Sequence, residues 1–137
     1  ISGEEGQVIT VHQDAYIEQA AMIMMDSKAS GMPVVDDDFR LVGMLSVIDI
    51  LKAMVEMLGV NRKGTRINLR VDHKPEVIRD IAEILVQHNT SFENIVEMET
   101  KDGKDLLILR IGSLDYKPII EEFKAKGFEV ESIISKQ

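Results

Sequence analysis

The chain has 137 residues, enough for one ordinary domain or two small ones, and 45% of them are hydrophobic, as in a globular protein. Its formal net charge of −8 argues against nucleic acid and anionic membranes as partners, because those surfaces attract basic faces. Cysteine is absent, which excludes disulfides and cysteine-based zinc sites. No signal peptide opens the chain and no apolar run is long enough to span a membrane, so we expect a cytoplasmic protein.

The first part of the chain alternates short apolar runs with helical periodicity. We predict a strand over 7–11, a helix with Asp14 as its N-cap, a hairpin of strands 32–35 and 40–45, and a helix that begins at Ser46. The acidic run 36–38 is expected at the turn of the hairpin. The first helix is expected to bury one face, made of Ile17, Ala20, Ala21, Met24 and Met25.

The glycine-flanked basic segment 59–64 predicts a boundary between a first domain, 1–60, and a second, 61–137. The second domain is expected to follow the order strand, helix, strand, strand, helix, strand, which is a ferredoxin-like arrangement. Its predicted landmarks are a strand over 65–71, a helix starting at Pro75, strands 92–99 and 106–111 joined at Asp102-Gly103, a helix ended by Gly127, and a last strand from Phe128. The predicted fold class is therefore α+β.

Two stretches carry a resemblance to known families. Residues 30–36 (SGMPVVD) and 41–50 (LVGMLSVIDI) resemble a CBS motif, and the second domain resembles an ACT domain through its element order and the loop 72–75 (DHKP). The join of 51–60 to 62–67 is similar to the bacterial acetoin-utilisation B-type proteins, which are built in the order CBS, CBS, ACT. The resemblance implies a regulatory protein.

This chain departs from that family in two places. It holds one CBS motif where the family has two that pack as a pair, so the missing half was lost, was removed, or is supplied by another chain. ACT domains that bind amino acids usually carry glycine after the loop proline, and Glu76 stands there in this chain. A small metabolite bound by the ACT half is therefore a secondary expectation.

Gly43, Ser46 and Asp49 form the candidate binding site. Gly43 would let a ligand approach the backbone, because it has no Cβ. Ser46 lies at a predicted helix start, where free N–H groups attract an anion, and Asp49, one turn on, can accept hydrogen bonds from a ribose diol. The same spacing also makes a capping box that needs no ligand, and both interpretations stay open.

The CBS resemblance implies an adenosine-type ligand held by Ser46 and Asp49. It also implies that the adenine is read by backbone groups near Ala29 to Met32, which include Gly31, with Ile9, Thr10, Val34 and Pro33 as walls. No Arg or Lys lies between Ser46 and Asp49, so AMP, adenosine or S-adenosylmethionine fits better than ATP. No further cofactor is expected.

Nothing in the sequence indicates catalysis or a metal site. His12, His73 and His88 lie in a turn, a loop and at a helix end, without metal-ligand spacing. No nucleophile elbow and no phosphate-transfer loop is present. We therefore expect a regulatory ligand-binding protein that is not an enzyme and that acts on a regulated enzyme partner or on its own assembly.

The alternative is an oligomerisation module with no small-molecule ligand. A homodimer or higher oligomer is expected in either case, because a lone CBS motif would expose the helix faces that normally pack on a second one. Those faces are expected over residues 22–25 and along the seam from Ile48 to Leu58.

Overall fold

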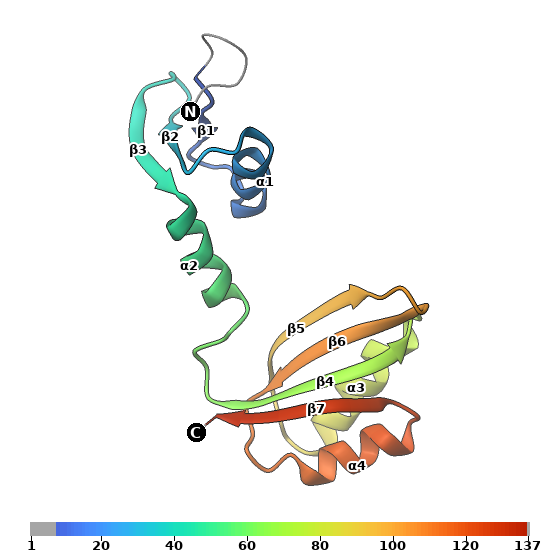
Figure 1. The fold of residues 1–137 in the computed structure, drawn as a ribbon. Helices are drawn as coiled ribbons and strands as arrows, with labels where there is room; N and C mark the ends of the chain where they lie inside the picture. The colour runs from blue at the N-terminus through green and yellow to red at the C-terminus, as the bar shows by residue number, and fades with distance from the viewer. Residues whose placement is uncertain (1–7, 137) are drawn as a thin grey trace. The chain divides into compact units, whose positions relative to one another are not determined.

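The computed structural model describes residues 8–136, so residue 7 of the predicted strand over 7–11 lies outside the described range, and the strand of the structure is later, at Val11–His12. The chain divides into two compact units between Glu56 and Met57 (Figure 1), whereas the boundary predicted from the sequence lies between residues 60 and 61. Both units mix helices and strands, which confirms the α+β class. No helix within 8–136 combines the length and apolar character needed to cross a membrane.

The first unit is a three-stranded sheet with two helices. Its elements are β1 (Val11–His12), α1 (Ile17–Ser27), β2 (Gly31–Val35), β3 (Leu41–Ser46) and α2 (Val47–Met57). The strand order is β1-β2-β3, with β1 parallel and β3 antiparallel to the central β2. The acidic run lies at the β2–β3 turn as predicted, where Asp36 Oδ1 accepts hydrogen bonds from the N–H groups of Asp38 and Arg40, both at 2.9 Å.

Helix α1 begins later than the sequence predicts. Tyr16 is the N-cap, and its N–H donates to Gln19 Oε1 at 3.2 Å. Asp14 lies in the preceding turn, where its N–H donates to His12 Nδ1 at 3.1 Å, so the prediction of Asp14 as the N-cap is wrong. The predicted buried face is right for Ala20 and Met24 but wrong for Met25, which is 71% exposed.

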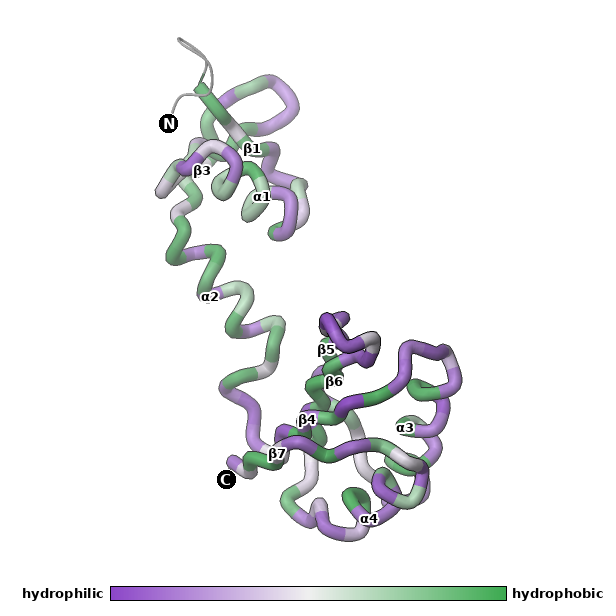
Figure 2. Tube along the Cα trace, turned by 45° about the vertical axis from the view of Figure 1, so that its right-hand side comes forward, coloured by the Kyte–Doolittle hydropathy of each residue, from purple (hydrophilic) through white to green (hydrophobic). Residues whose placement is uncertain are grey.

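The first unit buries little. Its core cluster consists of Val11, Ala20, Met24, Met32 and Ile50. Ile50 is the one buried residue of α2, although hydrophobic residues run along most of that helix (Figure 2). The exposed apolar side chains of α2 include Ile48, Leu51 and Val55, which we call the α2 stripe. The first unit therefore has a small core and leaves the apolar surface of α2 exposed, and burial of that surface would stabilise it further.

The second unit is a four-stranded sheet with two helices. Its elements are β4 (Gly64–Asp72), α3 (Glu76–Gln87), β5 (Phe92–Glu99), β6 (Lys104–Ile111), α4 (Lys117–Ala125) and β7 (Glu129–Lys136). The strand order is β5-β6-β4-β7, and every neighbouring pair is antiparallel. Both helices pack on one face of the sheet (Figure 1). On that face Leu69 and Leu109 join Ile81 of α3 and Phe123 of α4 in one core.

Strand β4 separates the two faces of this sheet. Ile67, Leu69 and Val71 point into the core, and the residues that alternate with them, Arg66, Asn68 and Arg70, lie on the opposite side. We call that side the open face. The strand begins at Gly64, whose φ is +131°, and a Cβ at this position would collide with the carbonyl oxygen of Ile111. Only glycine fits where the backbones approach so closely.

Candidate functional site

The candidate residues of the first unit gather on the β2–β3 hairpin and the start of α2. Gly31 pairs across the sheet with Ser46, and Gly43 pairs with Val34. The chain passes from β3 directly into α2, and the N–H of Val47 donates to Ser30 O at 3.1 Å. The sheet therefore fixes the end of β3, where α2 begins, against the start of β2.

Ser46 and Asp49 are hydrogen-bonded to each other. Asp49 Oδ2 accepts from the Ser46 N–H at 2.9 Å and from the Ser46 hydroxyl at 2.8 Å, and the Asp49 N–H donates to Ser46 Oγ at 3.2 Å. These are the reciprocal contacts of a capping box. The hydrogen bonds from the backbone and side chain of Ser46 hold the pKa of Asp49 below its ordinary value, so the exposed carboxylate stays ionised.

The capping contacts limit what this helix start can bind. The N–H groups of Ser46, Val47 and Asp49 and the Ser46 hydroxyl already have acceptors, so they are not free for a phosphate. An ionised carboxylate only accepts hydrogen bonds, and its second oxygen suits a donor such as a sugar hydroxyl.

Gly43 is exposed on β3, and a Cβ built at this position meets nothing within 4 Å. Its φ lies outside the left-handed region, so neither packing nor backbone conformation within the chain requires glycine here. Gly31 is tighter, since its Cβ would lie 3.4 Å from Leu45 O.

The other predicted residues differ in accessibility. Met32 is fully buried in the core, so only its backbone could reach a ligand, and Pro33 beside it is half-buried. Thr10 lines a different hollow, of about 370 Å³, together with residues of β1 and α1 that include His12 and Gln19. His12 Nε2 lies 2.7 Å from Asp37 Oδ1, which ties β1 to the acidic turn.

A titratable cluster in the second unit was not expected from the sequence. His73, Glu97 and Asp105 bring their ligand atoms within 4.8 Å of one another, and His73 Nδ1 lies 2.6 Å from Asp105 Oδ2. Asp105 is buried, and its hydrogen bond and charge raise the pKa of His73. A side-chain hydrogen bond with Glu97 and the one with His73 lower the pKa of Asp105. One imidazole and two carboxylates at this spacing could hold a divalent cation.

The cluster borders a pocket of about 580 Å³. Its walls include the loop residues His73 to Pro75, Val77 and Ile78 of α3, and Ile95 of β5. Asp105 lies on the same face of β6 as the buried residues Leu107, Leu109 and Ile111, which follow at every second position. The alternation of β6 could therefore have predicted an inward-facing carboxylate. The sequence carries no comparable indication that His73 and Glu97 meet it.

Residues 6–56 match the model of the CBS domain, so this chain contains a CBS domain. That match covers the first unit and the site of Gly43, Ser46 and Asp49.

Two known proteins are similar to parts or most of the chain. A homoserine O-acetyltransferase from Methanosalsum zhilinae is 32% identical over 95 residues, which are 69% of this chain and 19% of that protein. The chain thus corresponds to a small part of that enzyme's length. The crystal structure of CBSX2 in complex with AMP aligns over 89% of this chain and 92% of its own, with a TM-score of 0.33 and 18% identity.

Proposed function

We propose that this chain is a regulatory protein rather than an enzyme, and that its CBS domain senses an adenosine-type molecule such as AMP, adenosine or S-adenosylmethionine. The presence of a CBS domain supports the regulatory role. The observation that supports this ligand assignment is the exposed Gly43, where the fold itself does not require glycine. Gly43 lies three residues before Ser46, whose partner Asp49 is ionised.

In this proposal the nucleoside, rather than a phosphate, is the recognised part. Asp49 accepts the ribose hydroxyls through its outward oxygen, and the missing side chain of Gly43 lets the ligand lie against β3. Backbone groups at Gly31 and Met32 and the side chain of Pro33 complete the site in this proposal, whereas Thr10 lines the separate hollow beside β1 and α1. A regulated enzyme partner and a cytoplasmic location belong to the same proposal.

We further propose that a second copy completes the cleft, so that the protein works as a homodimer or higher oligomer. The α2 stripe and the small core of the first unit support this assembly. They also favour the second candidate function, an assembly module without a ligand.

The second unit is proposed to be an ACT-like domain with a ferredoxin-like fold. Its βαββαβ order and its strand order β5-β6-β4-β7 support this assignment. A small metabolite would bind in the pocket beside His73 and Pro75. Glu76 is exposed and is not part of the described lining, so its side chain leaves that pocket open.

Gly43→Ala tests the adenosine site. The substitution meets no atom of the chain, so thermal stability without ligand should stay as in the wild type. Calorimetry with AMP, adenosine and S-adenosylmethionine should give binding to the wild type and at least about tenfold weaker binding to the variant. Glu18→Ala, at an exposed position of α1 in the same unit, is the control and should leave ligand binding unchanged. Absence of binding by all three ligands to the oligomer would leave the assembly module as the function.

A further inference from the structure

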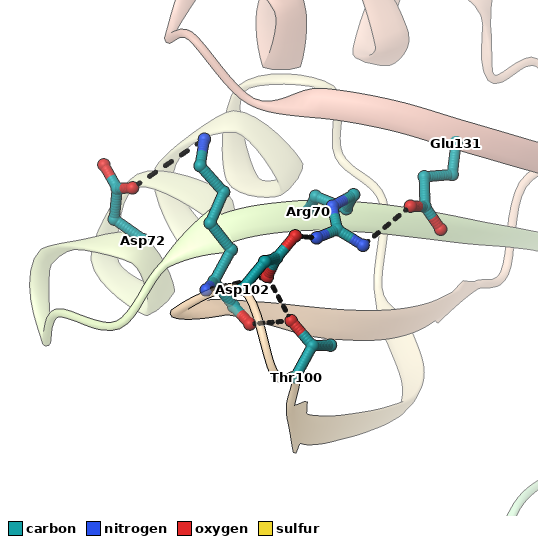
Figure 3. A network of polar contacts seen from close by, with 6 residues as sticks. Arg70, Asp72, Thr100, Asp102 and Glu131 are labelled. Atoms are coloured by element: carbon teal, nitrogen blue, oxygen red, sulfur yellow. Dashed lines mark hydrogen bonds and ion pairs between the residues drawn. The ribbon is translucent and has the colours of Figure 1, made fainter.

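Three arginines lie on the open face of the second unit's sheet, and only one of them has partners among the described residues. Arg70 forms ion pairs with Asp102 and with Glu131, the latter at 3.2 Å (Figure 3). Asp102 is itself held by the hydroxyl of Thr100. The charge of Arg70 is thus balanced by two carboxylates from neighbouring strands and turns.

Arg66 lies on the same face of β4, four residues before Arg70, and its surroundings are different. It pairs directly across the sheet with Arg110 of β6, so two like charges oppose each other. Within residues 8–136 neither guanidinium has an ion pair or a side-chain hydrogen bond, and Arg66 Nε is buried without an acceptor. Burial, and then the charge of Arg66, lower the pKa of Arg110.

The two arginines border a pocket of about 240 Å³ at the start of β4. Its walls include Arg62, Lys63, Gly64, Arg66, Arg110 and Lys136. Arg62 is already paired with Glu93 at 2.9 Å, and Lys136 Nζ lies 3.4 Å from Val60 O. The charges of Arg66, Arg110 and Lys63 are therefore gathered at one hollow in a chain whose net charge is −8.

Such an arrangement is unfavourable unless an anion is present. Like charges directly opposite each other destabilise a sheet, and a buried N–H without an acceptor loses its hydration without compensation. A phosphate group has several charged oxygens that accept from two planar guanidinium groups at once, often in bidentate geometry. It would accept hydrogen bonds from the outer guanidinium nitrogens of Arg66 and Arg110 and screen the repulsion between the two side chains.

We propose that this pocket binds a small phosphate-class anion, either inorganic phosphate or the phosphate group of a small metabolite, between Arg66 and Arg110. The volume corresponds to about eight water molecules, which suits a phosphate group with a small substituent. A polyanion such as nucleic acid does not fit the net charge of the chain. The site lies wholly in the second unit and is independent of the adenosine site.

Titration of the full chain with inorganic phosphate tests the proposal, with chloride at equal ionic strength as the reference. The NMR signal of Arg66 Nε–Hε should shift, and the thermal midpoint should rise, because a ligand bound only by the folded state stabilises it. Arg66→Gln and Arg110→Gln should each weaken binding at least about tenfold. Arg79→Gln is the matched control: it removes one positive charge from the exposed side of α3, and its phosphate affinity should equal that of the wild type.

A further readout separates a binding role from a structural one. Without phosphate, Arg66→Gln should be at least as stable as the wild type, because the substitution removes the repulsion with Arg110. Glycerol phosphate, tested beside inorganic phosphate, distinguishes the two kinds of anion that the pocket could bind. Tighter binding of the ester indicates that the ligand is a phosphorylated metabolite. An equal phosphate response in all four proteins would reduce the effect to ionic strength and overturn the proposal. Loss of self-association in Arg66→Gln, with no phosphate response in the wild type, would assign the arginines to a carboxylate of a second copy and overturn it too.

Discussion

Replacing Leu51 with aspartate tests whether the α2 stripe is an interface between copies. Leu51 is 51% exposed, so about half of its side chain is available for burial by a partner. Full burial of a leucine contributes ~1.5–3 kcal/mol, so the exposed half contributes about 1 kcal/mol per copy and about 2 kcal/mol in a symmetric dimer. A loss of 2 kcal/mol raises the dissociation constant about thirtyfold, and the desolvation of a carboxylate in the interface adds to that minimum.

Sedimentation velocity over a wide range of protein concentrations measures the effect. The wild type should be oligomeric at tens of micromolar, and Leu51→Asp should be monomeric there. Val86→Asp is the control, because Val86 is an exposed apolar residue of α3 in the second unit and should leave the assembly unchanged. Circular dichroism checks that helix content survives in both variants. A monomeric wild type, or unchanged association in Leu51→Asp, would refute the reasoning.

Two further substitutions test the second unit's core and the cap of α2. Phe123→Ala removes a fully buried ring whose centroid lies 6.0 Å from that of Phe128. The free energy of unfolding of the second unit, measured by urea denaturation, should fall by about 3–5 kcal/mol. A decrease of less than about 1 kcal/mol would contradict the described core. Asp49→Asn should flatten the acid dependence of α2 helicity, as measured by circular dichroism. Because the folded state lowers the pKa of Asp49, the ionised carboxylate stabilises the helix above the ordinary pKa of 3.8, and this stabilisation is lost as the pH falls through the lowered folded pKa. Equal acid profiles of the variant and the wild type would argue against the Ser46 contacts.

The second unit follows closely from local sequence patterns. Alternating residues predicted β4 and β6, Pro75 is the N-cap of α3, and Gly103 takes the left-handed conformation expected at the β5–β6 turn. Gly127, also left-handed, follows the C-cap of α4. Each of these features depends on the conformational preference of one or two residues, and that preference can be predicted from the residue types alone.

The parts that the sequence could not predict depend on pairing between distant strands. Arg66 meets Arg110, and His73 and Glu97 meet Asp105, only because of the register of β6 against β4 and β5. The spacing of Ser46 and Asp49 predicted both a binding pair and a capping box, and their mutual hydrogen bonds are those of the cap. Met25 fitted the helical period but lies at the edge of a core too small to cover it.

The close approach of Gly64 to Ile111 determines where β4 begins. Residues inserted just before Gly64 would leave the glycine against the Ile111 backbone but would displace Val60 and Arg62 from Lys136 and Glu93, because the segment from Met57 already belongs to the second unit. An extra residue just after Gly64 would instead slip β4 by one position, turning Ile67 and Leu69 outward and the arginines into the core. A change of length after Gly64 would therefore cost more than one before it, because only the former turns the core-facing residues of β4 outward.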